Sequence, residues 1–234
     1  MSPSPADDAV RATLGPHACR IEHEFDGTFG TGVLVGPNVM LTNSHVLRVA
    51  ETEYSTIALL FGAGADRRAC PLARLLFRSE GTEFEMTADG SDDADATCLD
   101  FVLVETTGSP GRDVMSMTAR RGWSPLMPAV DQLVTGDRLT ILGHPAASEQ
   151  LVARTATVLG IGGEGTRVFH DGETHGGSSG SPCYDDRMRL VALHNGSGGT
   201  GAFRGSGIKR AIPTVEILMC LQQHGLDGRV TGTP

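Results

Sequence analysis

Glycine and proline constrain the fold of this chain more than any other residue types. The 234 residues include 31 glycines and 12 prolines, which separate short runs of Val, Ile, Leu and Thr. Short apolar runs bounded by turn formers are typical of β-strands rather than helices. The length suits either one large all-β domain or two small barrels. We therefore predict an all-β protein.

Strand-length runs occur in both halves of the chain. In the first half they cover residues 30–36, 38–42 and 99–105, and in the second half residues 138–143, 151–159 and 189–194. After Pro182 we expect a hairpin that turns near Asp185 and Asp186. Only residues 211–223 show helical spacing, with Pro213 and Thr214 as start signals and Gly225 as a stop signal. We therefore expect one helix, at the C-terminus.

A connector divides the two halves. Residues 106–130 are rich in Gly, Ser, Pro and Arg and have weak periodicity, which is typical of a linking segment. We expect an N-terminal extension at residues 1–17, a first β unit at 18–110 and the connector at 111–130. A second β unit follows at 131–212, and a helix with a tail at 213–234.

Charge and segment composition exclude several partners. The net charge is −9 and the isoelectric point is near 5.3, which argues against nucleic acid. The N-terminus lacks the pattern of a secretory signal, and no apolar run reaches the roughly 18 residues of a membrane span. Odd in number and without a CxxC pair, the cysteines read as buried thiols, so we expect a reducing cytoplasm. They are Cys19, Cys70, Cys98, Cys183 and Cys220.

A small-residue loop, Gly176-Gly-Ser-Ser-Gly-Ser-Pro182, contains the candidate nucleophile Ser179. Acyl transfer needs two N–H groups aimed at the oxyanion of the tetrahedral intermediate, and the N–H groups of Gly177 and Ser179 fit this role. On this loop alone, a flexible Gly/Ser loop without catalytic function is an equally good interpretation.

The rest of the chain offers partners for this serine. A serine hydroxyl needs an imidazole to take its proton and a carboxylate to orient that imidazole. His45 follows an apolar strand in Leu41-Thr-Asn-Ser-His-Val-Leu, and Asp100 begins another in Cys98-Leu-Asp-Phe-Val-Leu-Val. The chain order is therefore His45, Asp100, Ser179.

These motifs, together with Gly30-Thr-Gly-Val-Leu-Val-Gly, resemble the trypsin-like peptidase family. The resemblance extends from about Cys19 to the C-terminal helix. Within this family, the sequence is similar in particular to a bacterial intracellular branch, to the glutamyl endopeptidases and to the high-temperature-requirement proteases. It implies two six-stranded antiparallel Greek-key barrels, a catalytic triad of His45, Asp100 and Ser179 in the cleft between them, and serine endopeptidase activity. Intracellular relatives often act in bacterial stress or defence systems.

Two departures from the family and two rivals qualify this interpretation. Digestive trypsins have an Asp before the nucleophile, whereas this chain has Ser178, so conventional zymogen activation is not expected. The chain stops soon after its helix, so regulation would come from a protein partner or surface loops. An α/β-hydrolase is disfavoured because position 181 is Ser rather than Gly and the triad order differs. A catalytically silent trypsin-like binding module is the alternative, and it would not react with a fluorophosphonate.

The signals for substrate specificity conflict. Thr174 and His194 match the pair with which glutamyl endopeptidases and viral chymotrypsin-like proteases hold Glu or Gln before the scissile bond. Glu173 lies where trypsins that cleave after Arg or Lys keep an Asp. We favour Glu or Gln, with basic and then small apolar residues as alternatives. A protonated His194 would add charge to such a pocket.

No cofactor or metal is expected, and the expected partner is a protein or peptide substrate. His170, Asp171, Glu173 and His175 could suggest a metal cluster, but side chains of an extended loop need not converge, so we interpret them as a polar pocket wall. The acidic loop at residues 89–95 lacks the spacing of an EF-hand and reads as a solvated surface loop rather than a calcium site.

Overall fold

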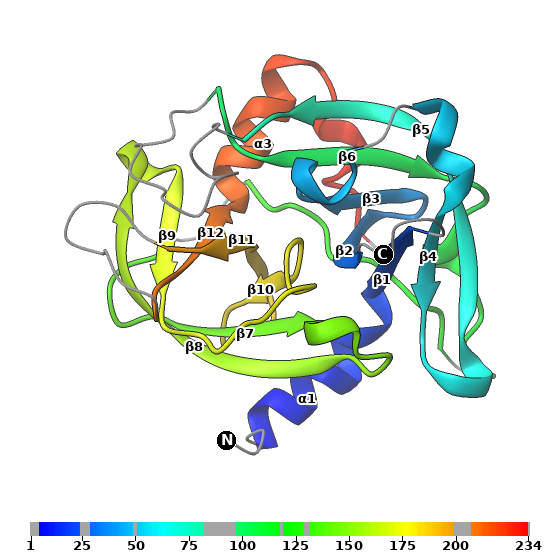
Figure 1. The fold of residues 1–234 in the computed structure, drawn as a ribbon, viewed down its shortest axis with the longest axis horizontal. Coiled ribbons are helices and arrows are strands. Elements are labelled where there is room, and N and C mark those ends of the chain that lie inside the picture. The colour runs from blue at the N-terminus through cyan, green and yellow to red at the C-terminus, as the bar shows by residue number, and fades with distance from the viewer. Residues whose placement is uncertain are drawn as a thin grey trace.

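The protein is represented by a computed structural model that describes residues 5–23, 29–48, 51–81, 97–117, 119–128, 132–198 and 207–233. Two closed six-stranded antiparallel barrels account for most of these residues (Figure 1). The prediction of an all-β double barrel with a C-terminal helix is therefore confirmed. The acidic loop at 89–95 lies outside the described residues.

The first barrel has the strand order β1-β2-β3-β6-β5-β4, and β4 pairs with β1 to close it. Strands β2, β3 and β6 were expected from the sequence. The other three were not expected, and charged residues or Pro interrupt the apolar runs of two of them, β1 and β5. The bounds are β1 (Ala18–His23), β2 (Phe29–Gly36), β3 (Val39–Thr42), β4 (Ile57–Phe61), β5 (Arg68–Ser79) and β6 (Phe101–Thr106).

The second barrel repeats this order as β7-β8-β9-β12-β11-β10, with β10 pairing with β7. The expected hairpin joins β10 to β11, where Asp185 N–H donates to the carbonyl oxygen of Arg189 at 3.1 Å. The bounds are β7 (Arg138–Gly143), β8 (Val152–Gly162), β9 (Arg167–His170), β10 (Pro182–Tyr184), β11 (Leu190–Ser197) and β12 (Lys209–Pro213).

Alternate side chains of a strand pack into two different hydrophobic cores, one inside a barrel and one between the two barrels. In β2, Leu34 packs inside the first barrel, whereas its neighbours Val33 and Val35 belong to a cluster that joins both barrels. Leu142 and Leu193 contribute to this joint cluster from the second barrel. Because successive side chains of a strand point to opposite faces, a strand buried on both faces reads as a continuous apolar run. The joint core fixes the two barrels against each other.

Helix α3 (Thr214–Gln223) begins after Pro213, as expected, and Gly225 follows its end in a left-handed conformation with φ 68°. Helix α1 (Pro5–Leu14) was not predicted and lies within the expected N-terminal extension. Its Val10 and Leu14 join the core that links the barrels. Both helices therefore pack against the barrel pair.

Helix α1 is also held by a buried carboxylate. Asp7 is only 2% exposed, and it accepts hydrogen bonds from the Thr155 hydroxyl at 2.7 Å and the Thr140 hydroxyl at 3.2 Å. These threonines lie on β8 and β7, so α1 is bound to the second barrel.

All five cysteines carry free thiols. Cys19 and Cys183 are buried, as expected, whereas Cys70, Cys98 and Cys220 are only half-buried, so the prediction of five buried thiols is wrong for these three. Cys70 and Cys220 are partly buried against the edges of the hydrophobic cores. No helix among the described residues is long and apolar enough to cross a membrane.

Candidate active site

Three loops at the barrel ends contain the residues expected to act in catalysis. His45 lies in the 3-10 turn Ser44–Val46 directly after β3, and Asp100 immediately precedes β6. Strands β3 and β6 pair antiparallel, with Thr42 opposite Val102, so the end of one meets the start of the other. Ser179 lies in the loop between β9 and β10 of the second barrel.

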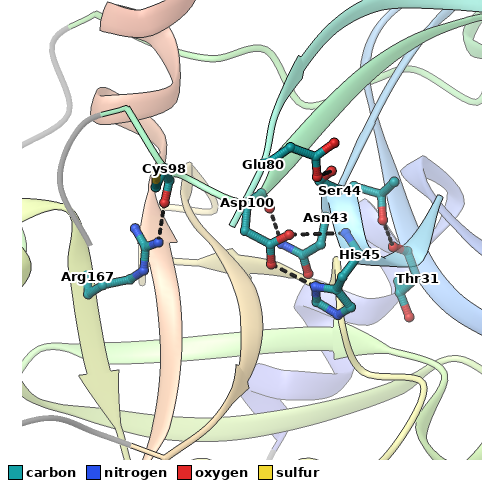
Figure 2. Close-up of polar contacts among 9 residues, drawn as sticks. Thr31, Asn43, Ser44, His45, Glu80, Cys98, Asp100 and Arg167 are labelled. Carbon is teal, nitrogen blue, oxygen red and sulfur yellow. Dashed lines mark hydrogen bonds and ion pairs between the residues drawn. The ribbon is translucent and has the colours of Figure 1, made fainter. Parts of the chain in front are cut away.

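The carboxylate of Asp100 binds His45 through both of its oxygens (Figure 2). The ring atom Nδ1 of His45 lies 2.7 Å from Oδ2, and the backbone N–H of His45 donates to Oδ1 at 3.1 Å. A carboxylate accepts, so the ring carries its proton on Nδ1, and the Nε2 lone pair is left to accept another. Asp100 is 2% exposed, which strengthens the interaction by excluding water.

Asp100 adopts a left-handed backbone conformation with φ 57°, which is costly for a residue other than glycine. Its carbonyl oxygen accepts from the Asn43 side chain at 2.9 Å and from Ser44 N–H at 3.4 Å. Its own N–H donates to the Glu80 carbonyl oxygen at 3.3 Å, and the Glu80 carboxylate accepts from the Ser44 hydroxyl at 2.5 Å (Figure 2). These contacts hold the strained backbone that aims the carboxylate at His45.

The second barrel also contacts the segment that leads to Asp100. Arg167 on β9 is buried, and its guanidinium donates to the carbonyl oxygen of Cys98 at 2.7 Å (Figure 2). This contact lies two residues before Asp100. The position of Asp100 therefore depends on both barrels.

Two consecutive type II turns shape the loop around Ser179. Ser178 N–H donates to the His175 carbonyl oxygen at 3.0 Å, and Ser181 N–H donates to the Ser178 carbonyl oxygen at 3.0 Å. The third residues of these turns, Gly177 and Gly180, have φ 90° and 81°, the geometry that a type II turn requires. Ser179 is the second residue of the second turn and is half-buried.

Glycine is required at both positions for space as well as for φ. A Cβ on Gly177 would overlap the Phe29 ring, and a Cβ on Gly180 would overlap the carbonyl oxygen of Thr31 and the hydroxyl of Thr42. A Cβ on Gly177 would also overlap the carbonyl oxygen of His144 in the second barrel, whereas Gly180 lies directly against the backbone of Thr31 in the first.

Thr31 on β2 binds the loop across the barrel boundary. Its N–H donates to the Ser179 carbonyl oxygen at 2.8 Å, and its hydroxyl donates to the Gly177 carbonyl oxygen at 3.0 Å. The Gly176 carbonyl oxygen accepts from Ala146 N–H at 2.6 Å, which turns the N–H of the same peptide, that of Gly177, the opposite way. Within the described part of the chain, neither Gly177 N–H nor Ser179 N–H donates to a protein acceptor.

Ser178 stabilises the same turn from within. Its hydroxyl accepts from His175 N–H at 3.3 Å, and the side chain is buried. The turn is therefore formed without a carboxylate at this position.

A cavity of about 300 Å³ lies beside Ser179 and brings most of the expected site residues together. His45, Ser179, Thr174 and His194 all line it. Among the described residues the His45 ring and the Ser179 hydroxyl share this wall without a hydrogen bond between them. Residues of the lining that the sequence motifs did not indicate are Arg48, Asn195, Gly196, Ser197 and Arg210.

Glu173 does not line this cavity. Its side chain is exposed, whereas Thr174 is buried in the wall. Neighbouring residues of an extended segment point to opposite sides, so the inward position of Thr174 turns Glu173 outward. The expectation that Glu173 belongs to the specificity pocket is therefore corrected.

The four residues considered as a metal cluster also do not converge. Asp171 accepts from the backbone N–H of Thr157 at 2.6 Å, and His175 lines the cavity. His170 instead contacts His194. Within the described ranges no group of three His, Cys, Asp or Glu side chains is placed to hold a metal ion.

A pair of imidazoles fixes the tautomer of His194. Gly172 N–H donates to His170 Nδ1 at 3.2 Å, so His170 carries its proton on Nε2, which lies 3.2 Å from His194 Nδ1. In the tautomer in which His194 Nδ1 accepts this bond, the proton of His194 is on Nε2. Burial lowers the pKa of His170 to about 4 and the pKa of His194 well below its usual value. His194 thus offers a neutral N–H donor rather than the charge considered from the sequence.

Comparison with known proteins identifies the family of this chain. Residues 30–193 match the trypsin-like peptidase domain. The chain therefore belongs to the trypsin-like peptidase family.

Individual relatives are distant. The chain is 25% identical over 175 residues to the uncharacterized protein y4fB of Sinorhizobium fredii; the match covers 71% of this chain and 25% of that protein, so the chain spans about a quarter of its length. Two solved structures share its fold. One is the serine endoprotease from Yersinia pestis, with TM-score 0.64, 18% identity, and coverage of 98% of this chain and 70% of that one. The other is the active form of the Rv3671c protease from M. tuberculosis, with TM-score 0.63, 15% identity, and coverage of 100% and 90%.

Proposed function

We propose that this protein is a serine endopeptidase that cleaves peptide bonds through an acyl-enzyme. Ser179 acts as the nucleophile, His45 as the general base and acid, and Asp100 as the carboxylate that orients His45. The observation that carries this proposal is the His45–Asp100 pair at 2.7 Å, on the wall of the cavity that also contains Ser179. Family membership over residues 30–193 supports it.

The proton positions support the first chemical step. With its proton held on Nδ1 by Asp100, His45 takes the Ser179 proton on Nε2 while Ser179 Oγ bonds to the carbonyl carbon of the substrate. The imidazolium then donates that proton to the leaving amine as the peptide bond breaks. Water, deprotonated by the same ring, releases the acyl group and restores the serine.

The oxyanion of each tetrahedral intermediate is stabilised by the N–H groups of Gly177 and Ser179. The peptides of these two N–H groups are held by Ala146 N–H on the Gly176 carbonyl oxygen and by Ser181 N–H on the Ser178 carbonyl oxygen, and Thr31 holds the carbonyl oxygens of Gly177 and Ser179 that follow them. The donors are therefore fixed before substrate arrives, the condition under which such donors lower a barrier most.

We further propose that the cavity receives a Glu or Gln side chain of the substrate. The Thr174 hydroxyl and the His194 Nε2–H are two donors for a side-chain carbonyl or carboxylate. The outward position of Glu173 removes the acidic floor that would favour a basic residue. The free thiols support a reducing, cytoplasmic location.

Active-site labelling combined with peptide hydrolysis tests the function. We expect Ser179→Ala to remove hydrolysis by on the order of 10³-fold or more and to abolish fluorophosphonate labelling without unfolding, because only the nucleophilic oxygen is lost. His45→Ala should lose a comparable amount, and Asp100→Asn a comparable or smaller amount, because the three act as a unit. The exposed Ser109→Ala is the matched control.

Retention of substantial kcat by purified Ser179→Ala would refute the assignment. A wild-type protein that is folded yet neither labelled nor active would indicate the catalytically silent binding module instead.

A further inference from the structure

The cavity beside Ser179 contains a charged side chain that no motif identified. Arg210 lines it, and this residue is only 5% exposed. We propose that Arg210 supplies the positive charge with which the cavity selects a carboxylate, so that the protein cleaves after Glu in preference to Gln. This inference rests on the proposed serine endopeptidase function and narrows its substrate class.

The strand register places this guanidinium near His194, one of the two hydrogen-bond donors proposed for the substrate side chain. Arg210 lies on β12 opposite Gly196 of β11, two residues after His194. A Cβ on Gly196 would lie 3.3 Å from Arg210 Nη2, so the absence of a side chain leaves the space beside the strand that the guanidinium uses. Gly196 and Arg210 both line the cavity.

The charge of the site has to come from arginine because the imidazoles do not supply it. The pKa values of His170 and His194 are lowered mainly by burial and additionally by the positive charge of Lys209. Both rings are therefore neutral near pH 7, and His194 serves only as a hydrogen-bond donor. A guanidinium stays protonated even when buried and presents donors that match a carboxylate.

The charge balance of the lining favours an anion. Its described residues include Arg48, Arg210 and the imidazoles of His45, His175 and His194, and none of them is acidic. On the neighbouring strand position, Lys209 donates to the hydroxyl of Ser197, which also lines the cavity, at 3.0 Å. A Lys or Arg side chain of the substrate would meet like charge here, and a neutral amide would gain less attraction than a carboxylate.

Peptides that differ only in the residue before the scissile bond test the proposal. Wild-type protein should cleave a Glu peptide about 10- to 100-fold faster in kcat/KM than the isosteric Gln peptide at pH 7.5, the range for hydrogen bonds to charged groups. Arg210→Met should lose that preference, so that its kcat/KM for the Glu peptide no longer exceeds that for the Gln peptide. Arg210→Lys should retain part of it, because it keeps the charge but not the planar fork.

Arg68→Met, which removes the same charge from an exposed position on β5, should retain the wild-type preference. The comparison of Glu with Gln in the wild type needs no variant and remains decisive if Arg210→Met fails to fold. Equal cleavage of the two peptides by wild type, or an unchanged preference in a labelled Arg210→Met, overturns the role of Arg210 and leaves the endopeptidase intact. Absence of both labelling and hydrolysis in the wild type overturns the proposed function itself.

Discussion

Three buried imidazoles make the stability of this fold depend steeply on pH between 6.5 and 4. Burial lowers the pKa of His17, His144 and His170 from 6.5 to about 4. As the pH falls below 6.5, the unfolded chain binds a proton at each ring while the folded chain does not. The contribution of these rings to the free energy of unfolding is therefore fully retained above pH 6.5 and is lost progressively as the pH approaches 4.

The magnitude follows from the width of this window. Each ring contributes about 3 kcal/mol between pH 7 and pH 4, because one pKa unit corresponds to about 1.4 kcal/mol. Three rings together contribute about 10 kcal/mol, comparable to the whole stability of a typical domain. Near pH 5 these three rings bind about three more protons in the unfolded state than in the folded state, which is a slope of about 4 kcal/mol per pH unit. Burial lowers the pKa of His194 as well, so this ring adds to the slope in the same direction. We expect unfolding before pH 4.

Urea unfolding at a series of pH values measures this slope. Trp123, the single tryptophan, is buried and donates to the carbonyl oxygen of Gly232 at 2.7 Å, so its fluorescence reports the folded state. His17→Gln should lower the slope near pH 5 by about 1.4 kcal/mol per pH unit, because the unfolded state then binds one proton fewer. The exposed His224→Gln should leave it unchanged. A free energy of unfolding that stays constant from pH 7 to pH 5, or equal effects of the two variants, would refute the reasoning.

Two further substitutions test other parts of the structure. Gly180→Ala should abolish fluorophosphonate labelling, because the φ of 81° and the overlap of a Cβ with Thr31 would disrupt the turn that contains Ser179. The control Gly136→Ala, at φ 97° in open space, should cost only about 1 kcal/mol of stability. Normal labelling of Gly180→Ala would contradict this prediction. Asp7→Ala should lower the free energy of unfolding by about 1–3 kcal/mol, because buried hydroxyls lose their acceptor, with kcat of the folded protein unchanged; an unaltered urea midpoint would show that α1 is not held this way.

The sequence allowed a functional residue to be predicted where that residue lies in a short, recognisable segment of the chain. His45, Asp100 and Ser179 each follow or begin an apolar strand or stand in a short motif of small residues, so their place could be predicted from sequence alone. The same motif around His45 includes Asn43, which holds the backbone of Asp100. The small residues of the loop at 176–182 indicated close backbone packing, but the two type II turns that require Gly177 and Gly180 were not predicted.

Contacts that depend on barrel closure could not be predicted in this way. His170 and His194 are 24 residues apart and meet only because β12 lies between β9 and β11. Arg210 lies on a strand of five residues after a Gly-rich stretch, so neither the strand nor its inward face was recognised. Glu173 was placed in the pocket wrongly because the distance in sequence from Ser179 does not show which side of an irregular extended segment a side chain occupies. Helix α1 was missed because only two of its ten residues, Val10 and Leu14, are large and apolar.

The bonds from Thr31 to the nucleophile loop have a consequence for how this molecule fails. Thr31 of the first barrel holds the carbonyl oxygens of Gly177 and Ser179 in the second, and Arg167 of the second barrel helps to hold the segment of Asp100 in the first. A copy whose halves have begun to separate therefore loses its chemistry while both halves are still largely folded.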